Sequence, residues 1–296
     1  MPASPTPSQS MDLKATNALE VQGLTARLPV GLGWRRKTIL EDMQLSLPRG
    51  QVLGLLGPNG SGKTTLLRHL AGLLRASRGT VRLFGQPATD PAVLARVTYL
   101  PEDSPFPEEL NGPQVLALLT NLRGKRGPAV RAAQDLALER AGLANVRKLP
   151  LGRYSRGMLR RFGLAQAFLL EPELVLLDEP TAGLDAPGLL LLDAWIREHR
   201  ARGGSLVLSS HSLSDLVDHT DRLAILWQGR VAVQGPTRSL LTDPESKRTQ
   251  WRGPVDVEAV RAFLADQGAT DIATDSVSRS VFDLYREIQA REPLGH

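Results

Sequence analysis

The stretch Gly57-Pro58-Asn59-Gly60-Ser61-Gly62-Lys63-Thr64 decides the fold of this chain. It matches the pattern G-x-x-x-x-G-K-[ST], and it lies between an apolar strand expected over Gln51 to Leu56 and a helix expected over Gly62 to Leu74. Glycines let successive backbone N–H groups turn inward around a phosphate chain, and the helix start adds its positive end. The pattern therefore predicts a nucleotide-binding loop. An ordinary glycine turn that caps a helix is the alternative.

Composition excludes several classes of protein. The chain has 296 residues, of which 42% are apolar, so it has room for a sizeable core. It contains no cysteine, which rules out disulfide scaffolds, thiol nucleophiles and cysteine-ligated metals. The 36 basic and 31 acidic side chains leave a net charge of +5, which fits a nucleotide, an anionic membrane surface or a nucleic acid equally well.

The order of elements around the loop predicts a doubly wound α/β domain. Leu174 to Leu177 shows no polar alternation, which is typical of a strand covered on both faces in a parallel sheet. Arg96 to Leu100 and Ser205 to Ser209 are further strands, and Arg160 to Leu170 is expected to be helical. Leu223 to Val233 is expected to form a hairpin. No apolar run approaches the roughly 20 residues that a membrane span requires.

Two adjacent carboxylates follow the buried strand. Asp178 and Glu179 come directly after Leu177, at the strand end where open α/β sheets bind their ligands. Asp178 is suited to Mg²⁺, and Glu179 to orienting and deprotonating an attacking water. A solvated acidic pair before a proline turn is the alternative.

Three further short motifs lie at fixed distances from these. They are Tyr154-Ser155-Arg156-Gly157-Met158, Ala182-Gly183-Leu184-Asp185 and Ser209-Ser210-His211. With them the chain resembles the ATP-binding subunits of ABC transporters over about residues 19–236. The resemblance implies a P-loop NTPase (RecA-like) α/β core with an antiparallel β subdomain, a helical insert at about 103–160 and a short C-terminal accessory segment.

The resemblance assigns a role to each motif. ATP and Mg²⁺ are the implied cofactors, with Thr64, Asp178 and Glu102 as metal ligands. Glu179 is the implied catalytic base, and His211 the residue that contacts the γ-phosphate. The implied phosphate-binding residues are Gly57, Pro58, Asn59, Gly60, Ser61, Gly62, Lys63, Thr64 and Thr65.

The resemblance also implies a homodimer in the ATP-bound state. Ser155 and Gly157 would contact the γ-phosphate held by the opposite protomer, and Asp185 would mediate contacts between protomers. A helix beginning at the serine cap of such a segment favours a polyanion.

Three departures from the family pattern stand out. The usual signature is Leu-Ser-Gly-Gly-Gln, and the corresponding residues here run from Tyr154 to Met158. Arg156 replaces the first glycine and Met158 replaces the glutamine. Glu102 stands in place of the usual glutamine, in a Tyr-Leu-Pro-Glu variant found among ABC-2-type exporters; a solvated or helix-capping glutamate is the alternative. Trp34 is the candidate for stacking on adenine, with a surface tryptophan as the alternative.

The expected domains are a disordered leader at 1–17, the ATPase domain at 18–236 and the accessory segment at 237–296. Within the last, helices are expected at Val257 to Gln267 and Arg279 to Ala290. An apolar stripe between Ser278 and Ile288 resembles the segment that ends many exporter ATPases, or is core packing.

The predicted function is an ATP-hydrolysing subunit that powers a separate membrane permease for export, at the cytoplasmic face of the membrane, without nucleic acid. The alternative is a soluble ABC-type ATPase of DNA repair or translation. The translation type needs two tandem cassettes, and only one phosphate loop is present. The repair types need a long coiled coil or zinc-binding cysteines, which the sequence lacks. A P-loop kinase or GTPase would not use the signature.

Overall fold

The computed structural model describes residues 17–30 and 35–241. Trp34, the first 16 residues and both helices expected beyond residue 250 lie outside the described residues. The chain divides into two compact units, residues 1–234 and 235–296. The second contributes only Gly235 to Leu241 to the description, including α7 (Thr237–Leu241).

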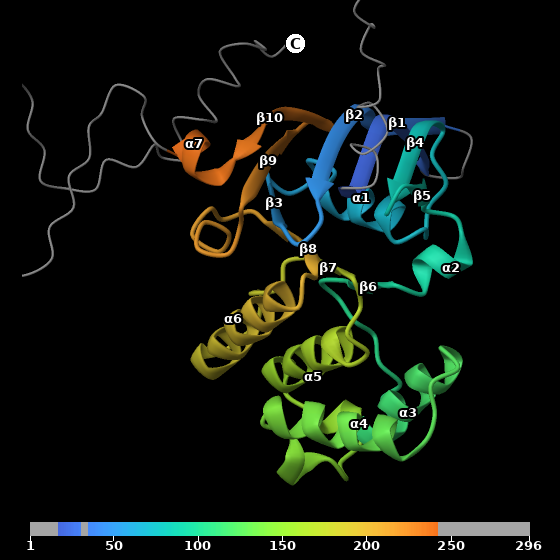
Figure 1. The fold of residues 1–296 in the computed structure, drawn as a ribbon, viewed down its shortest axis with the longest axis vertical. Helices are drawn as coiled ribbons and strands as arrows, with labels where there is room; N and C mark the ends of the chain where they lie inside the picture. The colour runs from blue at the N-terminus through green and yellow to red at the C-terminus, as the bar shows by residue number, and fades with distance from the viewer. Residues whose placement is uncertain (1–16, 31–34, 242–296) are drawn as a thin grey trace, which may run out of the picture. The chain divides into compact units, whose positions relative to one another are not determined.

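A six-stranded sheet forms the centre of the first unit, in the order β10-β9-β3-β8-β7-β6 (Figure 1). Its strands are β3 (Val52–Leu56), β6 (Val97–Leu100), β7 (Leu174–Leu177), β8 (Ser205–Ser210), β9 (Arg222–Trp227) and β10 (Arg230–Pro236). The five strands from β9 to β6 are parallel. Because parallel strands end at one edge, the segments that follow β3, β6, β7 and β8 come together there. The expected parallel sheet and the hairpin of β9 and β10 are confirmed.

The second sheet is antiparallel, in the order β2-β1-β4-β5. It consists of β1 (Asn17–Val30), β2 (Arg35–Pro48), β4 (Arg78–Leu83) and β5 (Gln86–Pro87). β1 pairs with both β2 and β4, and register shifts interrupt both ladders near Gly23. β1 begins at Asn17, one residue inside the expected leader.

Helix α1 (Lys63–Leu70) joins the two sheets into one core. Its buried face, Leu66, Leu67 and Leu70, belongs to a cluster that includes side chains of both sheets. The helix ends four residues before the expected Leu74, and that expectation was wrong. The reason is Gly72, whose φ of 71° lies outside the helical range. A Cβ at this position would lie 2.8 Å from the Ala88 carbonyl oxygen, so only glycine fits there.

The predicted helical insert is present between β6 and β7. It contains α3 (Gly112–Leu122), α4 (Pro128–Arg140) and the first part of α5 (Arg156–Phe168), with a short α2 (Pro91–Leu94) preceding β6. α5 packs against both β6 and α4, so it connects the insert to the sheet (Figure 1). It begins one turn before the expected Arg160 because Ser155 caps it.

Helix α6 (Ala186–Ala201) follows β7 and packs against α5 and β8. Asp185 caps it by accepting a hydrogen bond from the Gly188 N–H at 3.0 Å. In the described part of the chain, no helix combines the length and the apolar character needed to cross a bilayer.

Candidate nucleotide site

The loop between β3 and α1 forms a cradle lined by backbone. Gly60 and Gly62 have φ values of 82° and 106°, a range that glycine adopts without steric cost. A Cβ on Gly57 would lie 2.5 Å from the Leu226 carbonyl oxygen, so only glycine fits there. The Ser61 hydroxyl is buried and lacks a hydrogen-bond partner in the described part of the chain. These features fit a ligand rich in acceptor oxygens.

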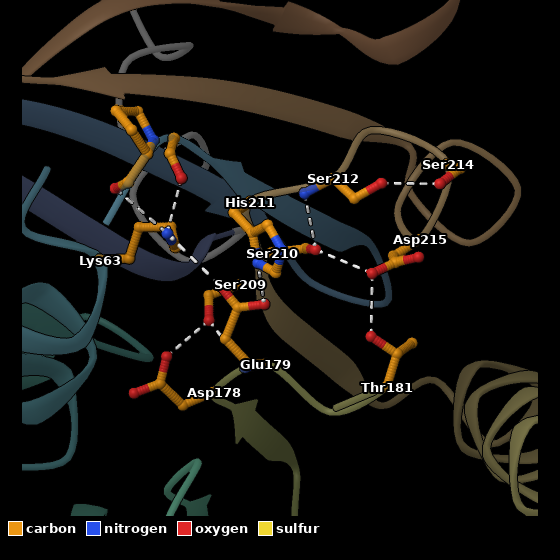
Figure 2. Close-up of polar contacts among 12 residues, drawn as sticks. Lys63, Asp178, Glu179, Thr181, Ser209, Ser210, His211, Ser212, Ser214 and Asp215 are labelled. Atoms are coloured by element: carbon orange, nitrogen blue, oxygen red, sulfur yellow. Dashed lines mark hydrogen bonds and ion pairs between the residues drawn. The ribbon is translucent and has the colours of Figure 1, made fainter. Parts of the chain in front are cut away.

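Lys63 is the first residue of α1, and its side chain turns back into the cradle (Figure 2). Its ammonium donates to the Gly57 carbonyl at 2.7 Å and lies 3.4 Å from Glu179 Oε1. Only 6% of the residue is exposed. Lys63 thus brings one positive charge to the point where the phosphate loop meets the end of β7.

Asp178 is held in place by two hydroxyl groups. The Ser209 hydroxyl donates to Oδ1 at 2.6 Å, and the Tyr99 hydroxyl contacts Oδ2 at 3.4 Å. Burial, together with the negative charge of Asp178, raises the pKa of Tyr99 to about 12, so the phenol remains a donor. Neither hydroxyl was predicted to serve the site, although Ser209 is the first residue of the quoted Ser209-Ser210-His211 motif.

Glu179 has a strained backbone, and both its N–H and its carboxylate make polar contacts. Its φ of 45° lies in the left-handed region, which is uncommon for residues other than glycine. Its N–H donates to the Ser209 hydroxyl at 2.9 Å, and its Oε2 lies 3.0 Å from His211 Nδ1 (Figure 2). Oε1 is buried and makes no hydrogen bond. Strain of this kind persists where the surroundings fix the residue, which is common at active sites.

A second polar network fixes the loop that carries His211. The Asp215 carboxylate accepts hydrogen bonds from Thr181 Oγ1 at 2.9 Å and from Ser210 Oγ at 3.0 Å. The Ser210 hydroxyl in turn accepts from the Ser212 N–H. Hydrogen bonds therefore join the segment after β7 to the end of β8 and the loop that follows it at two places besides the contact between Glu179 and His211: Thr181 bonds to Asp215, and the Glu179 N–H bonds to Ser209.

The signature stretch lies at the start of α5. Ser155 accepts from the Met158 N–H at 3.2 Å and leaves the remaining first-turn N–H groups to other partners. A Cβ on Gly157 would be 3.4 Å from the Gly183 carbonyl, so the stretch packs closely against the turn that follows β7. Ser155 is exposed, and Asp185 caps α6 within its own chain.

Glu102 lies apart from the buried carboxylates. Its side chain is exposed and lines a pocket of about 400 Å³ together with Arg156, Arg160 and Gly183. Within the described ranges, no three His, Asp or Glu side chains are close enough to hold a metal together. The structure therefore brings Thr64, Lys63, Asp178, Glu179 and His211 to one edge of the sheet, and Glu102 to its margin.

Comparison with known proteins identifies the family. The model of the ABC transporter family matches residues 40–182. An ABC transporter ATP-binding protein of Nostoc sp. (strain PCC 7120) is 38% identical over 229 residues, which cover 77% of this chain and 68% of that protein. The chain belongs to the ABC transporter ATP-binding proteins. The predicted ATP-hydrolysing subunit of an ABC transporter is thereby confirmed.

Two more comparisons refine this result. The daunorubicin/doxorubicin resistance ATP-binding protein DrrA of Streptomyces peucetius is 32% identical to this ABC protein, over 88% of this chain and 78% of its own. A solved dimeric ATP-binding cassette, bound to ADP and Pi in a post-hydrolysis state, matches with a TM-score of 0.67 over 74% of this chain and 99% of that chain. That cassette is 20% identical, so the match concerns the fold, and it confirms the expected fold class.

Proposed function

We propose that this ABC ATPase couples hydrolysis to a separate membrane permease and that it acts in export. The observation that carries the catalytic part is the convergence of Lys63, Glu179 and His211 within contact distance at one sheet edge. Export is supported by the similarity to DrrA and by the Tyr-Leu-Pro-Glu stretch that ends at Glu102. A permease on another chain places this subunit at the cytoplasmic face of the membrane.

The loop from Gly57 to Thr65 binds the phosphates of ATP. Lys63 exchanges its contact with the Gly57 carbonyl for the β- and γ-phosphates, and the free Ser61 hydroxyl and the loop N–H groups complete the cradle. The oxygen donors at this edge fit Mg²⁺. This ion usually takes only a few ligands from the protein and the rest from substrate phosphates and water, and the Thr64 hydroxyl and the Asp178 carboxylate would be those few. When bound, it would neutralise charge on those phosphates. Glu102 is proposed as an outer ligand.

Glu179 is the proposed general base. Its Oε1 makes no hydrogen bond, so this oxygen is available to accept a proton from water. His211 holds the other carboxylate oxygen, which fixes the direction in which Oε1 points. The His211 side chain is 63% exposed, so its ring has an open side toward a γ-phosphate.

Hydrolysis is proposed to occur in a homodimer. Ser155 and Gly157 stand at the exposed N-terminal end of α5, where a helix favours a negative charge. The phosphate loop of the same chain occupies another element, so we assign this surface to the nucleotide of the opposite protomer. Asp185 is proposed to contact the partner from the turn before α6, and Trp34 to stack on adenine.

The replacement of Glu179 by Gln tests the catalytic and the dimer proposal together. The side chain keeps its size and loses its basic oxygen, so turnover should fall by about 10²–10⁴-fold while ATP binding persists. Size-exclusion chromatography with light scattering should then show a dimer in Mg-ATP and a monomer without it. A variant that hydrolyses ATP at the wild-type rate would contradict the role of Glu179.

Two substitutions of Ser155, made in the E179Q background, provide a matched pair that differs only in charge. Asp and Asn both cap helices well, so S155D and S155N both preserve α5. Asp places a negative charge against the partner's γ-phosphate, whereas Asn does not. We expect S155D to abolish the ATP-dependent dimer and S155N to retain it. Equal dimerisation of the two would remove Tyr154 to Met158 from the interface.

A further inference from the structure

The Arg160 guanidinium is buried beneath the site. Arg160 lies on α5, a little more than one turn after Ser155, and is 7% exposed. Nη1 donates to the carbonyls of Pro101 and Glu102 at 2.8 and 3.0 Å. Nη2 donates to the carbonyls of Asp178 and Glu179, both at 2.7 Å, and Nε donates to Pro180 at 3.3 Å.

These contacts use the full hydrogen-bonding capacity of the side chain. A guanidinium has five N–H groups in a fixed plane, and each of the five finds a different backbone carbonyl. The carbonyls belong to two segments, 101–102 after β6 and 178–180 after β7. Burial lowers the pKa of Arg160, and the charges of Asp178, Glu102, Asp103 and Glu179 oppose that effect. The site thus contains a buried cation that no motif of the sequence predicted.

The position of these carbonyls sets Arg160 apart from a side chain that only fills the core. One of them, the Asp178 carbonyl, belongs to the peptide unit that joins Asp178 to Glu179, and the N–H of the same unit is held by Ser209. The Glu179 carbonyl belongs to the next peptide unit, so Arg160 contacts the backbone on both sides of the Glu179 Cα. Glu179 has the left-handed φ of 45°, a conformation that needs such external support. Pro101 and Glu102 lie on the other segment, at the margin of the site.

We propose that Arg160 is a positioning residue for ATP hydrolysis, which holds the Glu179 backbone and the Glu102 segment in one fixed relation to the start of the signature helix. The inference rests on the proposed role of Glu179 as general base. Through Arg160, any displacement of the α5 N-terminus moves both segments together, so the approach of a nucleotide to Ser155 changes the placement of the Glu179 carboxylate. Because all five Arg160 donors are used by backbone carbonyls, this role needs no contact between Arg160 and a phosphate.

The first test compares R160K and R160Q with the wild-type chain. Lysine keeps the charge but has three N–H groups on one atom, so it cannot reach both segments. A displacement of about 1 Å at the reacting groups costs about 10²-fold in rate, so kcat should fall by that order in both variants. KM for ATP and the Kd of a fluorescent ATP analogue should stay within about threefold of wild type, because phosphate binding is left intact.

Chemical rescue supplies a readout that a purely structural role would not move. The 400 Å³ pocket is lined by Arg160 and gives small solutes access to the space that R160A would open. Methylguanidinium at millimolar concentration should raise the kcat of R160A at least about tenfold, since it again presents a planar set of donors. Methylammonium should not. The proposal would be overturned if R160A kept its kcat, or if it lost kcat and methylguanidinium did not restore it.

Arg123 is the matched control. It also donates to β6, through Nη2 to the Val97 backbone carbonyl at 3.2 Å and through Nη1 to the Thr98 side-chain hydroxyl at 3.1 Å, but neither bond reaches the segment after β7. R123Q should lower the melting temperature without a change in kcat per folded molecule. If R123Q loses as much kcat as R160Q, general loosening explains both and the proposal fails.

E179Q is measured in the same series so that the two failures can be told apart. If E179Q abolishes turnover while R160K and R160Q retain it, the positioning role alone is wrong. If E179Q retains turnover, the role of Glu179 is wrong and the inference falls with it. Circular dichroism on every variant establishes the folded fraction, and R160K carries the comparison should R160Q not fold.

Discussion

Replacement of Ser209 by Ala removes one hydroxyl that serves both residues of the acidic pair. This hydroxyl is fully buried, donates to Asp178 Oδ1 at 2.6 Å and accepts from the Glu179 N–H at 2.9 Å. Each buried polar group left without its partner costs about 1–3 kcal/mol. We therefore expect S209A to lower the free energy of unfolding by about 2–6 kcal/mol, and the melting temperature by about 4–24 °C for a unit of this size.

The same change should weaken the proposed magnesium site. Ser209 does not bind a metal itself, but it orients the carboxylate of Asp178, the residue proposed as ligand. Loss of a partner that orients a metal ligand typically costs about 10–100-fold in metal affinity. The concentration of free Mg²⁺ that half-saturates ATP hydrolysis should rise in S209A by that factor, whereas KM for Mg-ATP at saturating Mg²⁺ should change much less.

Ser210 provides the control for stability. It too is fully buried, donates to a carboxylate, that of Asp215 at 3.0 Å, and accepts from a backbone N–H. S210A should therefore lose comparable stability in urea unfolding followed by circular dichroism, with an unchanged magnesium requirement. If S209A and S210A show the same magnesium dependence of ATP hydrolysis, the assignment of Asp178 as a ligand oriented by Ser209 is refuted.

Two further predictions concern coupling and pH. In the complex with its permease, E102A should reduce transport more than ATP hydrolysis, because Glu102 is exposed at the margin of the site rather than joined to the buried carboxylates; an equal loss of both would contradict a coupling role. Burial lowers the pKa of His199, so below pH about 6.5 the unfolded chain binds a proton that the folded chain does not. Stability should be constant above that pH and fall below it, by at most about 1.4 kcal/mol per pH unit for this histidine. In urea unfolding between pH 5 and 8, H199Q should flatten the slope, and an unchanged slope would exclude His199 as its source.

The sequence was sufficient where the deciding interactions are local. The run Leu174 to Leu177 is an all-apolar segment of strand length, and β7 spans the same four residues. An all-apolar strand is stable only where both of its faces are covered, so the pattern by itself indicates a central strand of a covered sheet. The phosphate loop is equally local, since the glycines, Lys63 and the following helix lie within a short stretch of chain.

The sequence was insufficient where residues far apart in the chain meet. Ser209 lies about 30 residues after Asp178, and its hydroxyl has no pattern that distinguishes it from any serine in a buried strand. Arg160 is one of two consecutive arginines on α5, and only the packing of α5 against the sheet shows which one enters the core. The neighbouring Arg161 instead donates to the Ala141 carbonyl within the helical insert.

The buried charges of the site, and two buried atoms that make no hydrogen bond, are arranged for a ligand. Lys63 and Arg160 are the cations, and Asp178 and Glu179 the anions, each no more than 7% exposed. Arg160 uses all its donors on backbone, which leaves Lys63 as the cation that is free to change partners. The oxygen that Lys63 approaches, Glu179 Oε1, and the hydroxyl of Ser61 are both buried without a hydrogen bond. A buried polar atom without a partner costs free energy, so a nucleotide whose phosphate oxygens accept from the Ser61 hydroxyl is favoured by more than its attraction to Lys63 alone. Once Lys63 moves to the phosphates, Glu179 Oε1 is open to accept a hydrogen bond from water. In the proposed mechanism the two cations therefore have different tasks: Arg160, with all its donors on backbone, holds the base in place, and Lys63 leaves the base when the substrate arrives.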